Sequence, residues 1–196
     1  MVKFTSKENL GKSENGGFFS MKKVCGFYVS SMHLVTMILP NIREEINEGT
    51  KIETFFEYNL NENINKVLSN LIINNEEKQK ILNINWKNKK IKKYSDLEKN
   101  IKNIIEKNEK INLIISGSEK YIIEVNKILD KIFNKYKNRK YSNITIINCY
   151  EVSAFNDNIR EILDLHEYII NTSGIHRIEE IFEETEDSKV QMNKAN

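Results

Sequence analysis

The chain has 196 residues, which is enough for one ordinary domain with additional terminal segments. Its 30 basic and 28 acidic side chains nearly balance, so no strong general attraction to nucleic acid or acidic membranes is expected. The two cysteines, Cys25 and Cys149, are too isolated for a disulfide framework or a CxxC metal site. No apolar run approaches the roughly 18–20 residues of a transmembrane helix. The first 20 residues lack the apolar core of a signal peptide, which favours a cytoplasmic location.

The chain begins with residues 1–20, which have no hydrophobic periodicity and are predicted to form a flexible leader. Short apolar runs then alternate with runs of helical period. Strands are predicted at about 23–29, 51–57, 81–85, 111–115 and 143–150, and helices at about 31–48, 62–73, 96–107, 118–137 and 158–166. This alternation is typical of an α/β doubly wound, mainly parallel five-stranded sheet flanked by helices. We therefore expect one domain over residues 21–172.

The last segment, residues 173–196, is predicted to be an amphipathic acidic helix followed by a disordered tail. Four apolar residues recur at helical spacing among acidic neighbours: Ile175, Ile178, Ile181 and Phe182. A helix of about 12 residues is marginal alone in water. Its apolar stripe is therefore expected to dock, either on the domain itself or on a partner.

Candidate functional residues cluster where the predicted strands end. In an open parallel sheet, ligands bind beyond the carboxyl ends of the strands. Six side chains are expected at or near that edge: Tyr28, His33, Ser116, Tyr150, Glu151 and His166. Aromatic rings and hydroxyl groups suit a mostly apolar pocket with a few polar anchors, so these residues are predicted to line a ligand site. For the two tyrosines, core packing with the hydroxyl reaching solvent is the alternative.

The histidines allow two interpretations each. His33 falls in the first turn after a strand, either as an exposed turn residue or as part of the pocket. His166 ends a predicted helix, where the helix dipole favours the protonated form, and a purely structural role is the alternative. The three histidines show no HExxH motif or zinc-ligand spacing, so neither a metal nor a cofactor is predicted.

Two rival functions rest on local patterns. The turn Ser116-Gly117-Ser118 opens a predicted helix and offers backbone amides to an anion, although the P-loop pattern is absent. This turn suggests a nucleotide- or phosphate-directed enzyme, with an ordinary capped turn as the alternative. The segment Trp86–Tyr94 places five lysines between two aromatic residues, which suggests contact with a nucleic-acid backbone. A solvated lysine-rich loop is the simpler interpretation of that cluster.

Two separated motifs resemble the MEDS family, sensory domains named for methanogens, methylotrophs and the dichloromethane regulator DcmR. The first is Gly26-Phe27-Tyr28, followed by Leu39-Pro40-Asn41-Ile42 and then by Gly49 before a strand. The second is Asn148-Cys149-Tyr150-Glu151, followed by a helix that ends near His166. The similarity spans about residues 22–170. Many members begin the first strand with His, where this chain has Lys23, and carry Asp where it has Glu151.

The resemblance implies a RecA/KaiC-like α/β core without a working Walker A loop and a sensory or regulatory role. Such domains are often coupled to kinases or transcription factors. We therefore expect a standalone, non-enzymatic domain in signal transduction or transcriptional control, which binds a small ligand or a regulatory protein. The expected site is the carboxyl edge of the sheet.

Overall fold

The computed structural model describes residues 20–89, 94–136, 143–155 and 158–181. The strands are β1 (Ser20–Tyr28), β2 (Lys51–Phe56), β3 (Lys110–Ser116), β4 (Asn143–Glu151), β5 (Tyr168–Asn171) and β6 (Gly174–Arg177). The helices are α1 (Ser31–Asn47), α2 (Asn61–Ser69), α3 (Asn75–Leu82), α4 (Tyr94–Lys107), α5 (Glu119–Tyr136), α6 (Val152–Phe155) and α7 (Ile159–Asp164). The predicted leader lies almost wholly outside the described residues.

The strands form one six-stranded sheet in the order β2-β3-β4-β1-β5-β6. All neighbouring strands are parallel except β5 and β6, which form an antiparallel pair at one edge. The predicted α/β class with a mainly parallel, helix-flanked sheet is confirmed, with six strands instead of five. The strands β3 and β4 are buried along almost their whole length, as expected where helices cover both faces.

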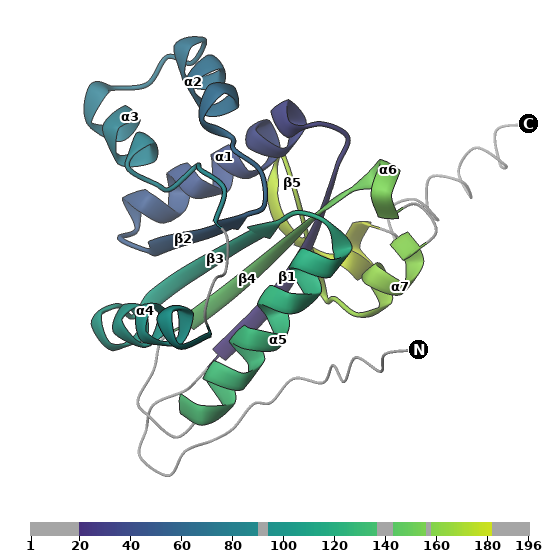
Figure 1. Cartoon of the computed structure of the whole chain (residues 1–196). Coiled ribbons are helices and arrows are strands. Elements are labelled where there is room, and N and C mark those ends of the chain that lie inside the picture. The colour runs from purple at the N-terminus through teal and green to yellow at the C-terminus, as the bar shows by residue number, and fades with distance from the viewer. Residues whose placement is uncertain (1–19, 90–93, 137–142, 156–157, 182–196) are drawn as a thin grey trace, which may run out of the picture.

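Helices cover both faces of the sheet (Figure 1). One core lies between the sheet and α1, α2 and α3, and contains residues such as Val35, Ile38 and Leu68. The second core lies between the opposite face and α4 and α5, and includes Ile101, Val125 and Leu129. Successive residues of a strand point to opposite faces, so each central strand contributes to both cores. Within the described residues, none of the helices has the length and apolar character needed to cross a membrane.

The strand predicted at 81–85 is wrong, because Ile81 and Leu82 lie in helix α3 and the residues from 83 on form an irregular segment. Asn74 caps this helix, since its side-chain oxygen accepts a hydrogen bond from the Glu77 amide at 2.8 Å. The apolar residues after the cap are buried by packing under α1. The irregular segment then runs along the free edge of β2, where the Lys89 amide donates to the Phe56 carbonyl at 2.7 Å.

The helix predicted from Gly174 is also corrected, because residues 174–177 form strand β6. Asn171 favours this hairpin: its side-chain oxygen accepts a hydrogen bond from the Ser173 amide at 2.8 Å. Gly174 then adopts a φ of 123°, a conformation that suits glycine. The sheet therefore continues past residue 172, and helical structure resumes at residue 178 and reaches residue 181, the last described residue. Phe182 and the acidic residues after it lie outside the described residues.

Candidate functional site

The carboxyl ends of β1 and β4 form the topological switch point of the sheet. From β1 the chain passes over one face to β2, whereas from β4 it passes under the other face to β5 on the opposite side. Tyr28 and Glu151 end these two strands and lie opposite each other in the register. Ser116 ends the neighbouring strand β3. The prediction that Tyr28, Ser116 and Tyr150 share one end of adjacent parallel strands is therefore confirmed.

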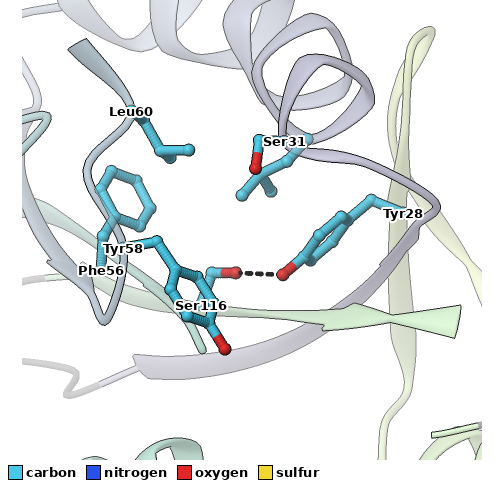
Figure 2. A pocket seen from close by; sticks show the side chains of 7 residues that line it. Tyr28, Ser31, Phe56, Tyr58, Leu60 and Ser116 are labelled. Carbon is cyan, nitrogen blue, oxygen red and sulfur yellow. Dashed lines mark hydrogen bonds between the residues drawn. The ribbon is translucent and has the colours of Figure 1, made fainter. Parts of the chain in front are cut away.

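Tyr28 and Ser116 form a hydrogen-bonded pair on the α1 side of this edge (Figure 2). The Ser116 hydroxyl donates to the Tyr28 hydroxyl oxygen at 3.0 Å, and both side chains are buried. Burial raises the pKa of Tyr28 to about 12, and the nearby Glu151 carboxylate adds to the rise. The phenol is therefore neutral at physiological pH, and the pair fixes the position of both hydroxyl groups.

The cavity beside this pair has a volume of about 10 Å³. It is lined by Tyr28, Ser31, Leu34, Phe56, Tyr58, Leu60 and Ser116. That volume corresponds to roughly one water molecule, whereas small-molecule pockets measure about 300–1,000 Å³. Figure 2 shows why the space is small: the tyrosine rings and the apolar side chains of Phe56 and Leu60 converge on it. The carboxyl edge thus has a closed interior in this conformation.

Tyr150 lies on the opposite face of the sheet, in the α5 core. Its ring packs edge-on against Phe155 at a centroid distance of 5.0 Å, and Phe27 lies 5.9 Å away. His166 approaches the same ring edge-on at 6.2 Å. Because strand residues alternate, Tyr150 and Tyr28 share an edge but cannot share a pocket. The prediction that Tyr150 and His166 line one site with Tyr28 is not supported by this arrangement, which instead matches core aromatic packing.

The rings of His166 and His33 both contact backbone groups four residues earlier in the chain. The Nδ1 atom of His166 lies 2.7 Å from the carbonyl oxygen of Ile162. Partial burial lowers the pKa of His166, an effect larger than the opposing hydrogen bond, and nearby Lys23 lowers it further. The expected dipole effect is thus outweighed, and the neutral form is favoured. His33 accepts a hydrogen bond from the Val29 amide at 3.2 Å, which closes the turn before α1.

Glu57 fills the turn that was considered as an anion site. The Ser118 amide donates a hydrogen bond to the Glu57 carboxylate at 2.5 Å. Gly117 permits this approach, since a Cβ there would lie 2.7 Å from the Glu57 Cβ and 2.8 Å from a Tyr121 ring carbon. The amino end of α5 therefore already holds an internal carboxylate, which opposes a second anion there. The sequence signal for Glu57 was its place just after an apolar strand, but that signal was missed.

Four side chains that end or directly follow strands β1, β2 and β4 are exposed or partly exposed, and we call Val29, Glu57, Tyr58 and Glu151 the carboxyl-edge surface. Val29 is 67% exposed and Tyr58 is 48% exposed, although both adjoin the ends of buried strands. Partial burial and the Glu57 and Glu151 carboxylates raise the pKa of Tyr58. Val29 and Tyr58 were not among the predicted site residues. In the sequence, Val29 and Tyr58 look like core residues at the ends of apolar strands. Their exposure depends on which loop covers the edge of the sheet, and that follows only from the tertiary structure.

The lysine-rich segment is only partly a surface feature. Trp86 is buried, donates from its ring nitrogen to the Ile81 carbonyl at 2.8 Å, and stacks on Phe56. Lys89 forms an ion pair with Glu53. Lys87 is exposed, and Lys90, Lys92 and Lys93 lie outside the described residues. One of the two aromatic residues of the proposed nucleic-acid contact, Trp86, is thus a core residue.

Within the part of the chain that the structure describes, no cluster of three or more His, Cys, Asp or Glu side chains is placed to hold a metal ion. Both cysteines are buried, Cys25 in the α5 core and Cys149 in the α1 core. Compared with protein-family models and with curated proteins, the chain shows no match.

Proposed function

We propose that this chain is a non-enzymatic regulatory domain that binds a regulatory protein through its carboxyl-edge surface. The observation that carries the proposal is the contrast between a closed interior and an exposed aromatic and apolar rim at the switch point. Ligand recognition in open α/β sheets is concentrated at this position. A sensory role, a RecA/KaiC-like core and a cytoplasmic location, all expected from the sequence, form part of the proposal.

A protein partner suits this surface better than a small ligand does. A cavity of about 10 Å³ has room for a water molecule but not for a metabolite. The Tyr28 and Ser116 hydroxyl groups that line it already form a hydrogen bond with each other. Val29 and Tyr58, in contrast, expose apolar and aromatic area to solvent, and aromatic residues are enriched where proteins bind one another.

The way in which the candidate groups are used supports the proposal of a non-enzymatic domain. Glu57 occupies the amides of the Ser116–Ser118 turn, and its charge would repel a phosphate. Tyr150 and His166 belong to the opposite core. We therefore expect purified protein with Mg²⁺ to hydrolyse neither ATP nor GTP. Hydrolysis that disappears in both Ser116→Ala and His166→Ala would instead support the phosphate-directed enzyme.

Site-specific crosslinking tests the proposed partner binding directly. A photoreactive phenylalanine derivative replaces Tyr58 in cells that naturally make the protein, and the crosslinked protein is identified by mass spectrometry. The same derivative at Lys110, which is exposed at the start of β3, serves as the control. We expect one partner at position 58 and none at position 110.

The identified partner is then purified and its affinity measured. We expect Val29→Asn to weaken binding at least about tenfold, because it replaces an apolar side chain of the surface by a polar one without changing the charge. Equal crosslinking at both positions, or unchanged affinity of the Val29→Asn variant, would contradict the proposal. A crosslink to a small molecule, with no crosslinked protein, would favour the small-ligand hypothesis instead.

A further inference from the structure

We infer that the carboxyl-edge surface receives a basic segment of its partner, in which an arginine or lysine lies beside an apolar side chain. The inference rests on the proposed function, because it specifies the chemistry of the partner at the same surface. Two independent properties of the surface carry it: the sign of its charges and the exposure of its aromatic and apolar groups.

The charges that flank Tyr58 are both negative. Glu57 directly follows β2, and Glu151 is the last residue of β4. The negative charges of both side chains raise the pKa of the Tyr58 hydroxyl. Glu151 acts on Tyr28 in the same way. Among the described residues, no lysine or arginine forms an ion pair with either carboxylate. An approaching cation therefore meets two carboxylates that no described lysine or arginine neutralises in an ion pair.

The two carboxylates differ in how much they remain available. Glu57 spends one oxygen on the Ser118 amide, so it is fixed in position but keeps its charge. Among the described residues, the Glu151 carboxylate accepts an exposed hydrogen bond from the Ser153 hydroxyl, at 3.2 Å. Because that contact is weak and open to solvent, an arginine or lysine of the partner can replace it with a charge-assisted hydrogen bond. Glu151 is thus the main anchor for the cation.

The exposed side chains fit the rest of such a segment. The half-exposed Tyr58 side chain offers aromatic area, to which a guanidinium or ammonium group is attracted. Val29 adds an exposed apolar contact at the end of β1. An acidic segment would meet repulsion from both carboxylates, and a nucleic-acid backbone would meet the same repulsion. A basic peptide with an adjacent apolar residue satisfies both properties of the surface.

Selection from a phage-displayed library of random short peptides tests the inference with the full chain as the target. We expect the selected peptides to be enriched in arginine or lysine next to an apolar residue. Their affinity, measured by fluorescence anisotropy, is expected to fall about tenfold for Glu151→Gln, which removes one charge-assisted contact. Binding is also expected to weaken as salt concentration rises.

Glu48→Gln is the matched control, because Glu48 is an equally charged residue at the opposite edge that pairs with Lys110. Its affinity for the selected peptides should equal that of the unmodified protein. Three outcomes would overturn the inference. The selected peptides could lack basic residues, the two substitutions could have equal effects, or the protein could self-associate through a surface that covers position 58. If crosslinking at position 58 still captures a partner in that case, the proposed function stands. If crosslinking also fails, both fall.

Discussion

The two sides of the carboxyl edge are built from adjacent residues but serve different purposes. Tyr28 and Glu151 face the α1 side, while their chain neighbours Phe27 and Tyr150 face the α5 side. The α5 side is closed by Phe155 and His166 into an aromatic cluster. The α1 side keeps a water-sized cavity and an exposed rim. A polar or aromatic residue at a strand end is therefore informative only when its face is known.

The largest expected effect of this difference is on stability. Tyr150→Ala should lower the free energy of unfolding by about 3 kcal/mol, because it leaves a cavity among Phe27, Phe155 and His166. Urea denaturation followed by the fluorescence of Trp86, the single tryptophan, measures the change. A loss below about 1 kcal/mol would mean that the aromatic cluster is not a packed core.

A smaller loss is expected at the turn that Glu57 fills. Gly117→Ala should cost about 2 kcal/mol, because the added methyl group would lie within 2.8 Å of Glu57 and Tyr121 atoms and must push them apart. The same denaturation measurement applies. Unchanged stability would show that the turn has room for a side chain, and the argument that Glu57 blocks an anion there would lose its support.

The buried hydroxyl pair gives a third prediction. Tyr28→Phe should lower the free energy of unfolding by about 1 kcal/mol, because it leaves the Ser116 hydroxyl without its acceptor. The double variant Tyr28→Phe with Ser116→Ala is the control. It should be more stable than the sum of the two single-variant losses predicts, because both polar partners are then removed together. A purely additive result would mean that the two hydroxyl groups do not interact.

His166 predicts a pH dependence on the α5 side. Its folded-state pKa lies below the unfolded value of about 6.5, so the unfolded chain binds the proton first on acidification. Its contribution to stability is therefore complete above about pH 6.5 and is lost as the pH falls towards the folded-state pKa. The loss of stability between pH 7.5 and 5.5, measured as the shift of the urea midpoint, should be smaller for His166→Gln than for the unmodified protein. Equal losses would contradict burial as the cause.

Much of the fold could be predicted from hydrophobic period, but two segments could not. The run Ile81-Leu82-Asn83-Ile84 alternates weakly like a strand, yet the Asn74 cap and the contacts under α1 select a helix. Ile175 and Ile178 have helical spacing, yet Asn171 and Gly174 build a hairpin that adds β6 to the sheet. In both cases local capping or turn chemistry overrode a short apolar pattern.

The sequence predicts which edge of the sheet carries the candidate residues, but not which face of the sheet each side chain points to. Tyr28, Ser116, Tyr150 and Glu151 do end neighbouring strands, because apolar runs reveal where strands stop. Which side each residue faces depends on where a run begins and on which helix covers it, and a single residue of uncertainty inverts the assignment. Glu57 was missed for a related reason, since only the tertiary approach of β2 to the α5 turn gives it a role.

The central claim is that the α1 side of the edge binds a partner while the α5 side supports the fold. The most direct test measures Tyr58→Ala for both properties, with the partner identified by crosslinking. Because Tyr58 is 48% exposed, the free energy of unfolding should change by less than about 0.5 kcal/mol. Partner affinity should fall at least about tenfold. Unchanged affinity with an intact fold would contradict the account.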